Sequence, residues 1–169
     1  VSGTGSPMYY AARLAKKQYP DAKVVFVGPC VAKRKEAQRD ECVDYVLTFE
    51  EIGSILSGLD IHLEQVKPYA MSFVSVREAQ GFGQAGGVMG AVKSYLKFDA
   101  SRVKGIQVSD LNRKNIAALR AYAKTGKVPA NFIEVMACEG GCITGPSSYS
   151  GEKGKRLFIQ ELSKCEKTY

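Results

Sequence analysis

The sequence predicts an α/β domain in which a mainly parallel β-sheet of about four strands is flanked by helices. Short runs of apolar and β-branched residues alternate with longer segments whose apolar residues recur at helical spacing. This alternation is typical of parallel sheets, whose strands are joined by crossover helices. The 169 residues contain neither an internal repeat nor a linker that would divide them, so we expect a single domain over residues 1–169.

The first helix and the first strand follow from local signals. Pro7 suits the first turn of a helix, with Ser6 as its cap, and apolar spacing continues to about Tyr19. Residues 23–28 then form a nearly all-apolar, β-branched run. Such a run is typical of a strand that is buried on both faces of a parallel sheet.

The next three elements complete the first half of the chain. One or two helical turns are expected over residues 32–39, and a second strand over residues 42–48. Thr48 is placed to cap a helix over residues 49–57, and Glu51 completes a capping box.

The second half is expected to supply the remaining two strands. A glycine-rich segment opens a helix that ends near Lys97, and Ser109 or Asp110 is placed to cap a later helix that Gly126 ends. We expect a loop over residues 58–68, an extended stretch over 69–76 and the glycine-opened helix over 81–97. A strand over 103–109, a helix over 112–124 and a strand over 131–137 follow. A polar loop over 147–154 and a last helix over 155–167 complete the chain.

Composition favours a water-soluble protein with a dispersed positive charge. The hydrophobic content is 45%, and no apolar run approaches the roughly 20 residues of a membrane helix. The net charge of +7 comes from Lys and Arg spread along the chain, which is typical of solvated helix faces. No aromatic-basic interleaving supports nucleic-acid binding. A basic face could equally dock an acidic electron-transfer partner.

Five cysteines, an odd number without a secretory signal, argue against a disulfide framework and for a cytoplasmic protein. Two of them, Cys138 and Cys142, lie on a glycine-rich loop that follows a strand. Cys30 ends another strand-like run. We therefore expect these three thiols to meet and hold a metal centre. Cys42 and Cys165 have no assigned role.

The spacing of the three thiols leaves the metal open. Zinc usually takes paired Cys-x-x-Cys knuckles, which this chain lacks, whereas iron–sulfur clusters accept thiols from scattered loops. Lys33 and Glu36 lie on one face of a helical turn with Cys30, and they aim a cation and a carboxylate at whatever Cys30 binds. Thiol catalysis is a weaker alternative, because it would need the lone His62 as its base.

A glycine stretch matches a dinucleotide fingerprint by its letters alone. Gly81, Gly83 and Gly86 have the required spacing, but residues 77–80 separate them from the preceding strand. No acidic residue ends a strand at the required distance. The glycines are better explained by close packing of backbone against a neighbour or a cofactor.

Four segments resemble [FeFe]-hydrogenases, the iron-only hydrogenases. Residues 29–36, PCVAKRKE, resemble the family's P-C-x-x-K-x-x-E motif, and residues 136–145, MACEGGCITG, resemble M-x-C-x-x-G-C-x-x-G. Residues 82–89, FGQAGGVM, resemble F-G-x-x-G-G-V-M, and residues 1–7 resemble a segment that opens with serine and ends in Ser-Pro. The matches occur in the family's order, and the two cysteine motifs are specific.

The resemblance implies a two-lobed α/β domain that carries the H-cluster, a [4Fe–4S] cubane joined to a diiron subcluster. Cys30 and Cys138 would ligate the cubane and Cys142 would bridge it to the diiron unit. Lys33 would donate to a cyanide ligand, and Glu36 would hold Lys33. Ser2 would lie on the proton path, Ser6 and Pro7 would contact the ligands of the diiron unit, and Met136 would pack against them. Gly86 and Gly87 would approach the cofactor with their backbone.

The implied activity is reversible formation of H2 in the cytoplasm of an anaerobic bacterium. A ferredoxin-like electron-transfer protein or an N-terminal iron–sulfur domain would be the partner, with no nucleic acid and no membrane. A non-catalytic iron–sulfur assembly protein or a redox sensor is the alternative.

Several positions depart from the family pattern. The family's T-S-C-C-P motif, which would supply a fourth cubane ligand, has no counterpart, so we expect a piece of a longer domain that is inactive by itself. Gly28, Met8 and Pro146 stand where the family usually has other residues around the diiron unit. These changes favour a divergent or sensory branch.

Overall fold

The computed structural model describes residues 2–69, 76–149 and 151–165. The predicted extended stretch over residues 69–76 therefore lies almost wholly outside the described residues. The chain divides into two compact units. Unit 1 comprises Val1–Val66 and Pro146–Tyr149, and unit 2 comprises Lys67–Gly145 and Ser150–Tyr169. This division does not test the single-domain interpretation, which stays a prediction.

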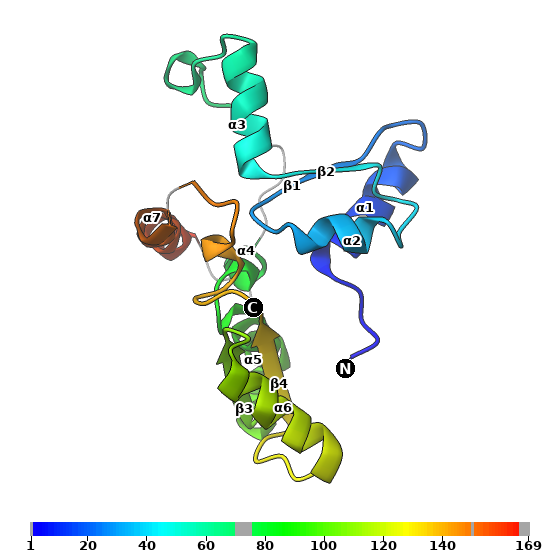
Figure 1. The fold of residues 1–169 in the computed structure, drawn as a ribbon, viewed down its shortest axis with the longest axis vertical. Coiled ribbons are helices and arrows are strands. Elements are labelled where there is room, and N and C mark those ends of the chain that lie inside the picture. Colours follow the sequence, from blue (N-terminus) through cyan, green and yellow to red (C-terminus); the bar gives the residue numbers. More distant parts are fainter. Residues whose placement is uncertain (1, 70–75, 150, 166–169) are drawn as a thin grey trace. The chain divides into compact units, whose positions relative to one another are not determined.

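Unit 1 is built on two short parallel strands, β1 (Val25–Val27) and β2 (Tyr45–Leu47). They lie side by side in Figure 1, with α1 and α2 near them. Three helices and one 3-10 turn complete the unit, and they are α1 (Pro7–Gln18), α2 (Ala32–Ala37), α3 (Phe49–Gly58) and η1 (Leu63–Gln65).

The core of unit 1 lies between α1 and the two strands. Met8, Ala12 and Val43 are buried, and Phe26 and Val46 pack against them. The side chains of Val25 and Val27 are 45% and 40% exposed, so the prediction of a strand buried on both faces is wrong. The reason is that, within the described residues, β1 pairs only with β2, and the hydrophobic core contacts one face of this narrow sheet.

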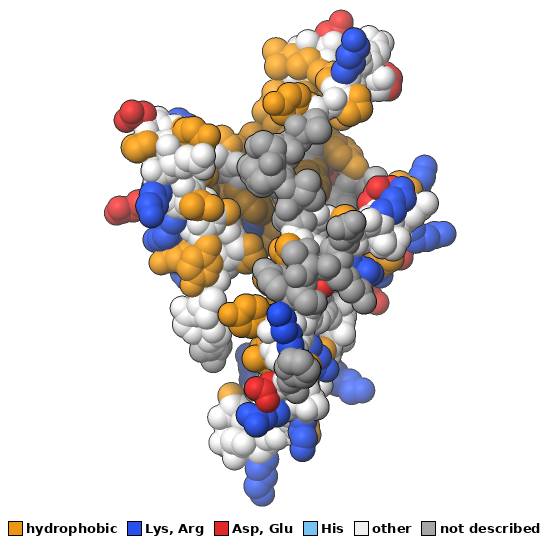
Figure 2. All heavy atoms as spheres, turned by 180° about the vertical axis from the view of Figure 1, so that it is seen from behind, with side chains coloured by type: hydrophobic (Ala, Val, Ile, Leu, Met, Phe, Trp, Pro, Cys, Tyr) orange, Lys and Arg blue, Asp and Glu red, His pale blue; other side chains and the backbone are white. Residues whose placement is uncertain are grey.

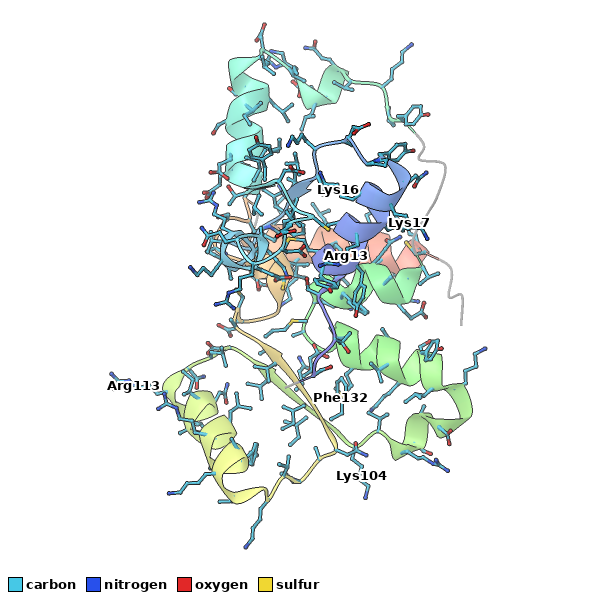
Figure 3. The ribbon with its side chains drawn as sticks, turned by 90° about the vertical axis from the view of Figure 1, so that its right-hand side faces the viewer. Arg13, Lys16, Lys17, Lys104, Arg113 and Phe132 are labelled. Carbon is cyan, nitrogen blue, oxygen red and sulfur yellow. The ribbon has the colours of Figure 1, made fainter. Side chains whose placement is uncertain are left out.

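Unit 2 contains the other parallel pair, β3 (Gly105–Ser109) and β4 (Phe132–Met136). Ile106 pairs with Ile133, and Gln107 pairs with Glu134. Figure 3 shows this pair between two helices, one of them carrying the labelled Arg113. The helices and 3-10 turns of the unit are α4 (Arg77–Gln80), η2 (Gly81–Gly83), α5 (Gly87–Leu96), η3 (Lys97–Arg102), α6 (Arg113–Thr125), η4 (Cys142–Thr144) and α7 (Gly151–Lys164).

The fold-class prediction is confirmed: the described residues contain four parallel strands flanked by helices, arranged as two small two-stranded sheets. The predicted cap of the helix that Gly126 ends is wrong. Asn112, rather than Ser109 or Asp110, caps α6, because its side-chain oxygen accepts a hydrogen bond from the Asn115 amide. The last helix begins at Gly151, four residues before the predicted start at 155. The polar composition of this segment concealed its helical first turn.

The positive charge is dispersed, as the sequence predicted. Lys and Arg side chains form several separate groups on the face shown in Figure 2. In Figure 3, Arg13, Lys16 and Lys17 come from α1, whereas Lys104 and Arg113 belong to unit 2. Arg13 and Lys16 are neutralised locally, through ion pairs of 2.9 Å each with Asp40 and Asp44. Among the helices of the described residues, none is long and apolar enough to cross a membrane.

Candidate metal centre

Unit 1 holds one of the predicted cysteine ligands, Cys30, in the turn between β1 and α2. The carbonyl of Cys30 accepts a hydrogen bond from the Lys33 amide at 3.2 Å, which starts the helical turn. The carbonyl of Pro29 accepts one from the Ser147 amide at 3.4 Å. The segment Pro146–Tyr149 therefore packs on the Cys30 turn within the same unit.

Lys33 and Glu36 form the ion pair that their spacing predicts. The ammonium nitrogen Nζ of Lys33 lies 2.5 Å from Oε2 of Glu36. The hydroxyl of Ser6 donates a hydrogen bond to the other carboxylate oxygen, Oε1. Glu36 thus accepts from both sides, and Lys33 is held by a carboxylate that is itself anchored to α1.

These contacts keep Glu36 ionised. Partial burial alone would raise the pKa of its carboxyl, but the hydrogen bonds from Lys33 and Ser6 and the charge of Lys33 outweigh it and hold the pKa below its ordinary value. The Lys33 side chain is 21% exposed, so its charge is only partly screened by water. Unit 1 therefore presents a restrained ammonium group one turn after Cys30.

The two other predicted contacts of unit 1 differ in their surroundings. Pro7 is the first residue of α1, directly after the Ser6 cap. Ser2 is exposed, and its hydroxyl donates to Oγ1 of Thr4 at 3.0 Å. The predicted roles of Ser2, Ser6 and Pro7 toward a cofactor stay predictions.

Unit 2 holds the other two predicted ligands, Cys138 and Cys142, on the loop that follows β4. The loop turns through Gly140 and Gly141, which have φ angles of 78° and 105°. These left-handed angles explain why glycine occupies both positions. The amide of Gly141 donates to the Cys138 carbonyl at 3.1 Å, and Met136 is buried just before the loop.

The glycine-rich segment lies against this loop. The Ala85 amide donates to the Gly140 carbonyl at 3.1 Å, and Gln84 forms an antiparallel bridge with Gly141. A Cβ atom on Gly141 would lie 2.6 Å from the backbone nitrogen of Ala85. A Cβ atom on Gly83, one of the three glycines for which close packing was predicted, would lie 3.0 Å from the Ile143 side chain, directly after Cys142. Close packing against a neighbour is therefore present at Gly83, and the neighbour is the cysteine loop.

Glu134 is a site residue that sequence reasoning missed. It lies in the middle of β4, it is only 5% exposed, and its two carboxylate oxygens accept from the amides of Gly86 at 2.7 Å and Met89 at 2.8 Å. The signal that could have revealed it is an acidic residue inside an otherwise apolar strand, residues 132–136. Buried carboxylates require partners, so such a residue predicts a specific polar contact.

The predicted site residues thus fall into two groups. Unit 1 contains Ser2, Ser6, Pro7, Cys30, Lys33 and Glu36, and hydrogen bonds join Ser6, Glu36 and Lys33. Unit 2 contains Gly86, Gly87, Met136, Cys138 and Cys142, and the glycine turn lies against the cysteine loop there. In neither unit do three or more His, Cys, Asp or Glu of the described residues gather in a way that could hold a metal ion. The donor types nevertheless fit an anionic iron–sulfur group, because thiolates are the usual ligands of such clusters and the held ammonium is a hydrogen-bond donor.

Comparison with known sequences identifies the family. Residues 1–146 match the family described as "Iron only hydrogenase large subunit, C-terminal domain". The "Nuclear prelamin A recognition factor" of Danio rerio is 28% identical, over 82% of this chain and 39% of that protein. The "Cytosolic Fe-S cluster assembly factor narfl" of Danio rerio is 26% identical, over 98% of this chain and 54% of that protein. "Iron hydrogenase 1" of Clostridium pasteurianum is 27% identical, over 86% of this chain and 33% of that protein.

The fold is shared with solved [FeFe]-hydrogenase structures. A Chlamydomonas reinhardtii [FeFe]-hydrogenase superposes with a TM-score of 0.65 at 21% identity, covering 99% of this chain and 62% of that chain. The chain spans only 33% to 54% of the length of the three relatives named above. Because the family pattern covers residues 1–146 of the 169, the chain belongs to the iron-only hydrogenase family, in the part that forms the C-terminal domain of the large subunit.

Proposed function

We propose that this chain is the iron–sulfur-binding part of a hydrogenase-like protein that takes an H-cluster. The observation that carries the proposal is the hydrogen-bond chain Ser6–Glu36–Lys33, which starts at the cap of α1 and ends at an ammonium group one turn after Cys30. A plain cubane needs only thiolates. A restrained cation one helical turn after one of them suits a further anionic ligand, such as the cyanide of a diiron subcluster.

In this proposal each side chain has one task. Cys30 and Cys138 would supply thiolates to the [4Fe–4S] cubane, and Cys142 would bridge it to the diiron unit. Lys33 donates a hydrogen bond to an anionic ligand, while Glu36 and Ser6 keep Lys33 in place. The H-cluster, when bound, supplies the redox chemistry 2H+ + 2e− ⇌ H2.

The remaining contacts follow from the same family pattern. Ser2 would lie on the proton path, Pro7 and Met136 would pack against the cofactor, and Gly86 and Gly87 would approach it with their backbone. A ferredoxin-like protein or an N-terminal iron–sulfur domain would deliver electrons in the cytoplasm. The three proposed thiol ligands are one fewer than the four that a cubane takes, so we expect these 169 residues alone to evolve no hydrogen.

The ligand set is tested by anaerobic reconstitution with iron and sulfide, followed by optical and EPR spectroscopy. Cys30→Ala, Cys138→Ala and Cys142→Ala should each lower the iron bound and change the EPR spectrum. Cys42→Ala and Cys165→Ala serve as matched controls and should load as the parent protein does. Equal iron in all five variants would show that these three thiols do not form the site.

A non-catalytic assembly function is the second candidate, because the similar proteins include a named Fe–S cluster assembly factor as well as a hydrogenase. The two functions differ at Lys33. For a hydrogenase, Lys33→Met should abolish hydrogen evolution by the matured protein that carries this domain, while the cubane EPR signal remains. Lys17→Met, at an exposed lysine of α1, is the control. Absence of hydrogen evolution from the matured, unsubstituted protein would favour the assembly function.

A further inference from the structure

The carboxylate of Glu134 performs the capping of a helix that has no cap of its own. The N-cap residue of α5 is Gly86, which has no side chain, and the first turn of α5 contains no acidic residue. One oxygen of Glu134 accepts from the N-cap amide of Gly86, and the other accepts from the amide of Met89 at the third helical position. In an ordinary capping box two side chains of the helix satisfy these amides. Here one carboxylate from β4, 48 residues from Gly86, satisfies both.

The position of Glu134 is enforced by burial. A carboxylate that is 5% exposed is costly unless it is fully bonded, and it gains further from the positive end of the helix dipole. The glycine turn that it holds has little freedom, because a Cβ on Gly86 would lie 3.1 Å from the Gln107 side chain, and one on Gly87 would collide with the Gly81 carbonyl. Glu134 therefore fixes the turn as well as the helix.

The same turn supports the cysteine loop. Ala85, adjacent to the held Gly86, donates to the Gly140 carbonyl, and Gln84 bridges to Gly141. Cys138, where the loop begins, lies four residues after Glu134, just past the end of β4. One carboxylate thus connects the strand that delivers Cys138 to the turn that packs between Cys138 and Cys142.

We propose that Glu134 is a positioning residue, which holds the loop of Cys138 and Cys142 through the glycine turn of residues 84–87. Its carboxylate oxygens bond to the backbone amides of Gly86 and Met89, so it reaches the loop through Gly86 and the adjacent Ala85. The effect of Glu134 on a bound cluster rests on the proposed function, whereas its effect on the conformation of the cysteine loop does not.

The test measures residue-resolved amide hydrogen exchange in the iron-free protein, with Glu134→Gln compared with Glu41→Gln. Glu41 is exposed and lies in unit 1, so it is a charge-matched control. Loss of one charge-assisted hydrogen bond should speed exchange at Gly86 and Met89 on the order of fivefold. The proposal further requires faster exchange at Ala85 and Gly141, with the β3–β4 amides unchanged.

Acceleration confined to Gly86 and Met89 would overturn the proposal, because Glu134 would then cap α5 without holding the loop. If Glu134→Gln does not fold, Glu134→Asp replaces it; its shorter side chain can reach one amide but not both, so exchange should rise less. After iron–sulfide loading, the Glu134→Gln protein should show a changed EPR line shape. A parent protein that takes up no iron would contradict the proposed function and leave the exchange result to decide the role of Glu134.

Discussion

The hydroxyl of Ser6 donates a hydrogen bond to Oε1 of Glu36 and joins the first turn of α1 to α2 across 30 residues. The same hydroxyl oxygen accepts from the Tyr9 amide at 3.3 Å, as an N-cap does. Ser6 therefore connects α1 to α2 within unit 1, in addition to being a predicted cofactor contact. The two roles can be separated by measuring stability without any cofactor.

Ser6→Ala should lower the free energy of unfolding by about 1–2 kcal/mol, because it removes a helix cap and one partner of a charged side chain. Urea denaturation of the iron-free protein measures this loss. Ser57→Ala is the control, since Ser57 is exposed near the end of α3 and the replacement should be close to neutral. A Ser6→Ala protein as stable as the parent would show that the hydrogen bonds of Ser6 contribute nothing to the free energy of unfolding.

Asp44 predicts a pH dependence of unit 1. Hydrogen bonds from Lys16, from the Val24 amide and from Lys23 hold the pKa of its carboxyl far below the ordinary value. A depressed folded-state pKa means that the carboxylate stabilises the fold at every pH above the unfolded-state value of about 4. This stabilisation is lost progressively as the pH falls below about 4.

The measurement compares Asp44→Asn with the parent protein in urea at pH 7 and at pH 3. The substitution should destabilise the protein at pH 7, and the difference should narrow at pH 3. Asp21→Asn provides the control at an exposed aspartate of the same unit. A difference that is as large at pH 3 as at pH 7 would contradict the assignment.

Local signals predicted the caps of α1 and α3, although they failed at the cap of α6 and the start of α7. The Ser6 cap and the Thr48–Glu51 capping box depend on residues three apart, so their pattern is visible in the sequence. The Lys33–Glu36 ion pair is of the same kind. Non-local pairing was less accessible. About four strands were expected in one sheet, but the sequence does not say which strands pair. In the described part of the chain they form two pairs, β1 with β2 and β3 with β4.

The candidate site shows the same limit. The hydrogen bonds of Glu134 to Gly86 and Met89 join residues 48 and 45 positions apart, and a repeating pattern in the sequence cannot predict contacts over such separations. Met8 is a further example. It departs from the family pattern beside Ser6 and Pro7, at a position that the resemblance places around the diiron unit, yet its side chain is buried in the core of unit 1. Only the packing in the structure distinguishes a core residue from a neighbour of the cofactor at this position.

Two glycines of unit 2 should respond to alanine with opposite sign. Gly141 has a φ of 105°, and a Cβ there would lie 2.6 Å from Ala85 N and 2.7 Å from Gly83 O. Gly141→Ala should therefore cost about 2–3 kcal/mol through backbone strain. Gly90 lies exposed within α5 with nothing within 4 Å of a Cβ, so Gly90→Ala should stabilise by about 0.5–1 kcal/mol.

Urea denaturation of the two variants decides this prediction, and each serves as the control for the other. Both positions lie in unit 2, so a non-specific effect of added methyl groups would shift both midpoints in one direction. Two shifts of the same sign would show that the contact between the turn of residues 84–87 and the cysteine loop is not restrictive.

Met8 provides the last prediction, because its burial gives it a structural role that needs no cofactor. Its side chain is 4% exposed and packs with Ala12 and Val43. Met8→Ala should lower the free energy of unfolding by about 2–4 kcal/mol through lost contacts and the cavity left behind. Met8→Leu nearly conserves volume and should cost less than about 1.5 kcal/mol. Leu14→Ala, on the same helix at a side chain that is 66% exposed, is the control and should change little. If Met8→Ala and Leu14→Ala have equal effects in the iron-free protein, Met8 is not a core residue, and its departure from the family pattern would have to be explained at the cofactor.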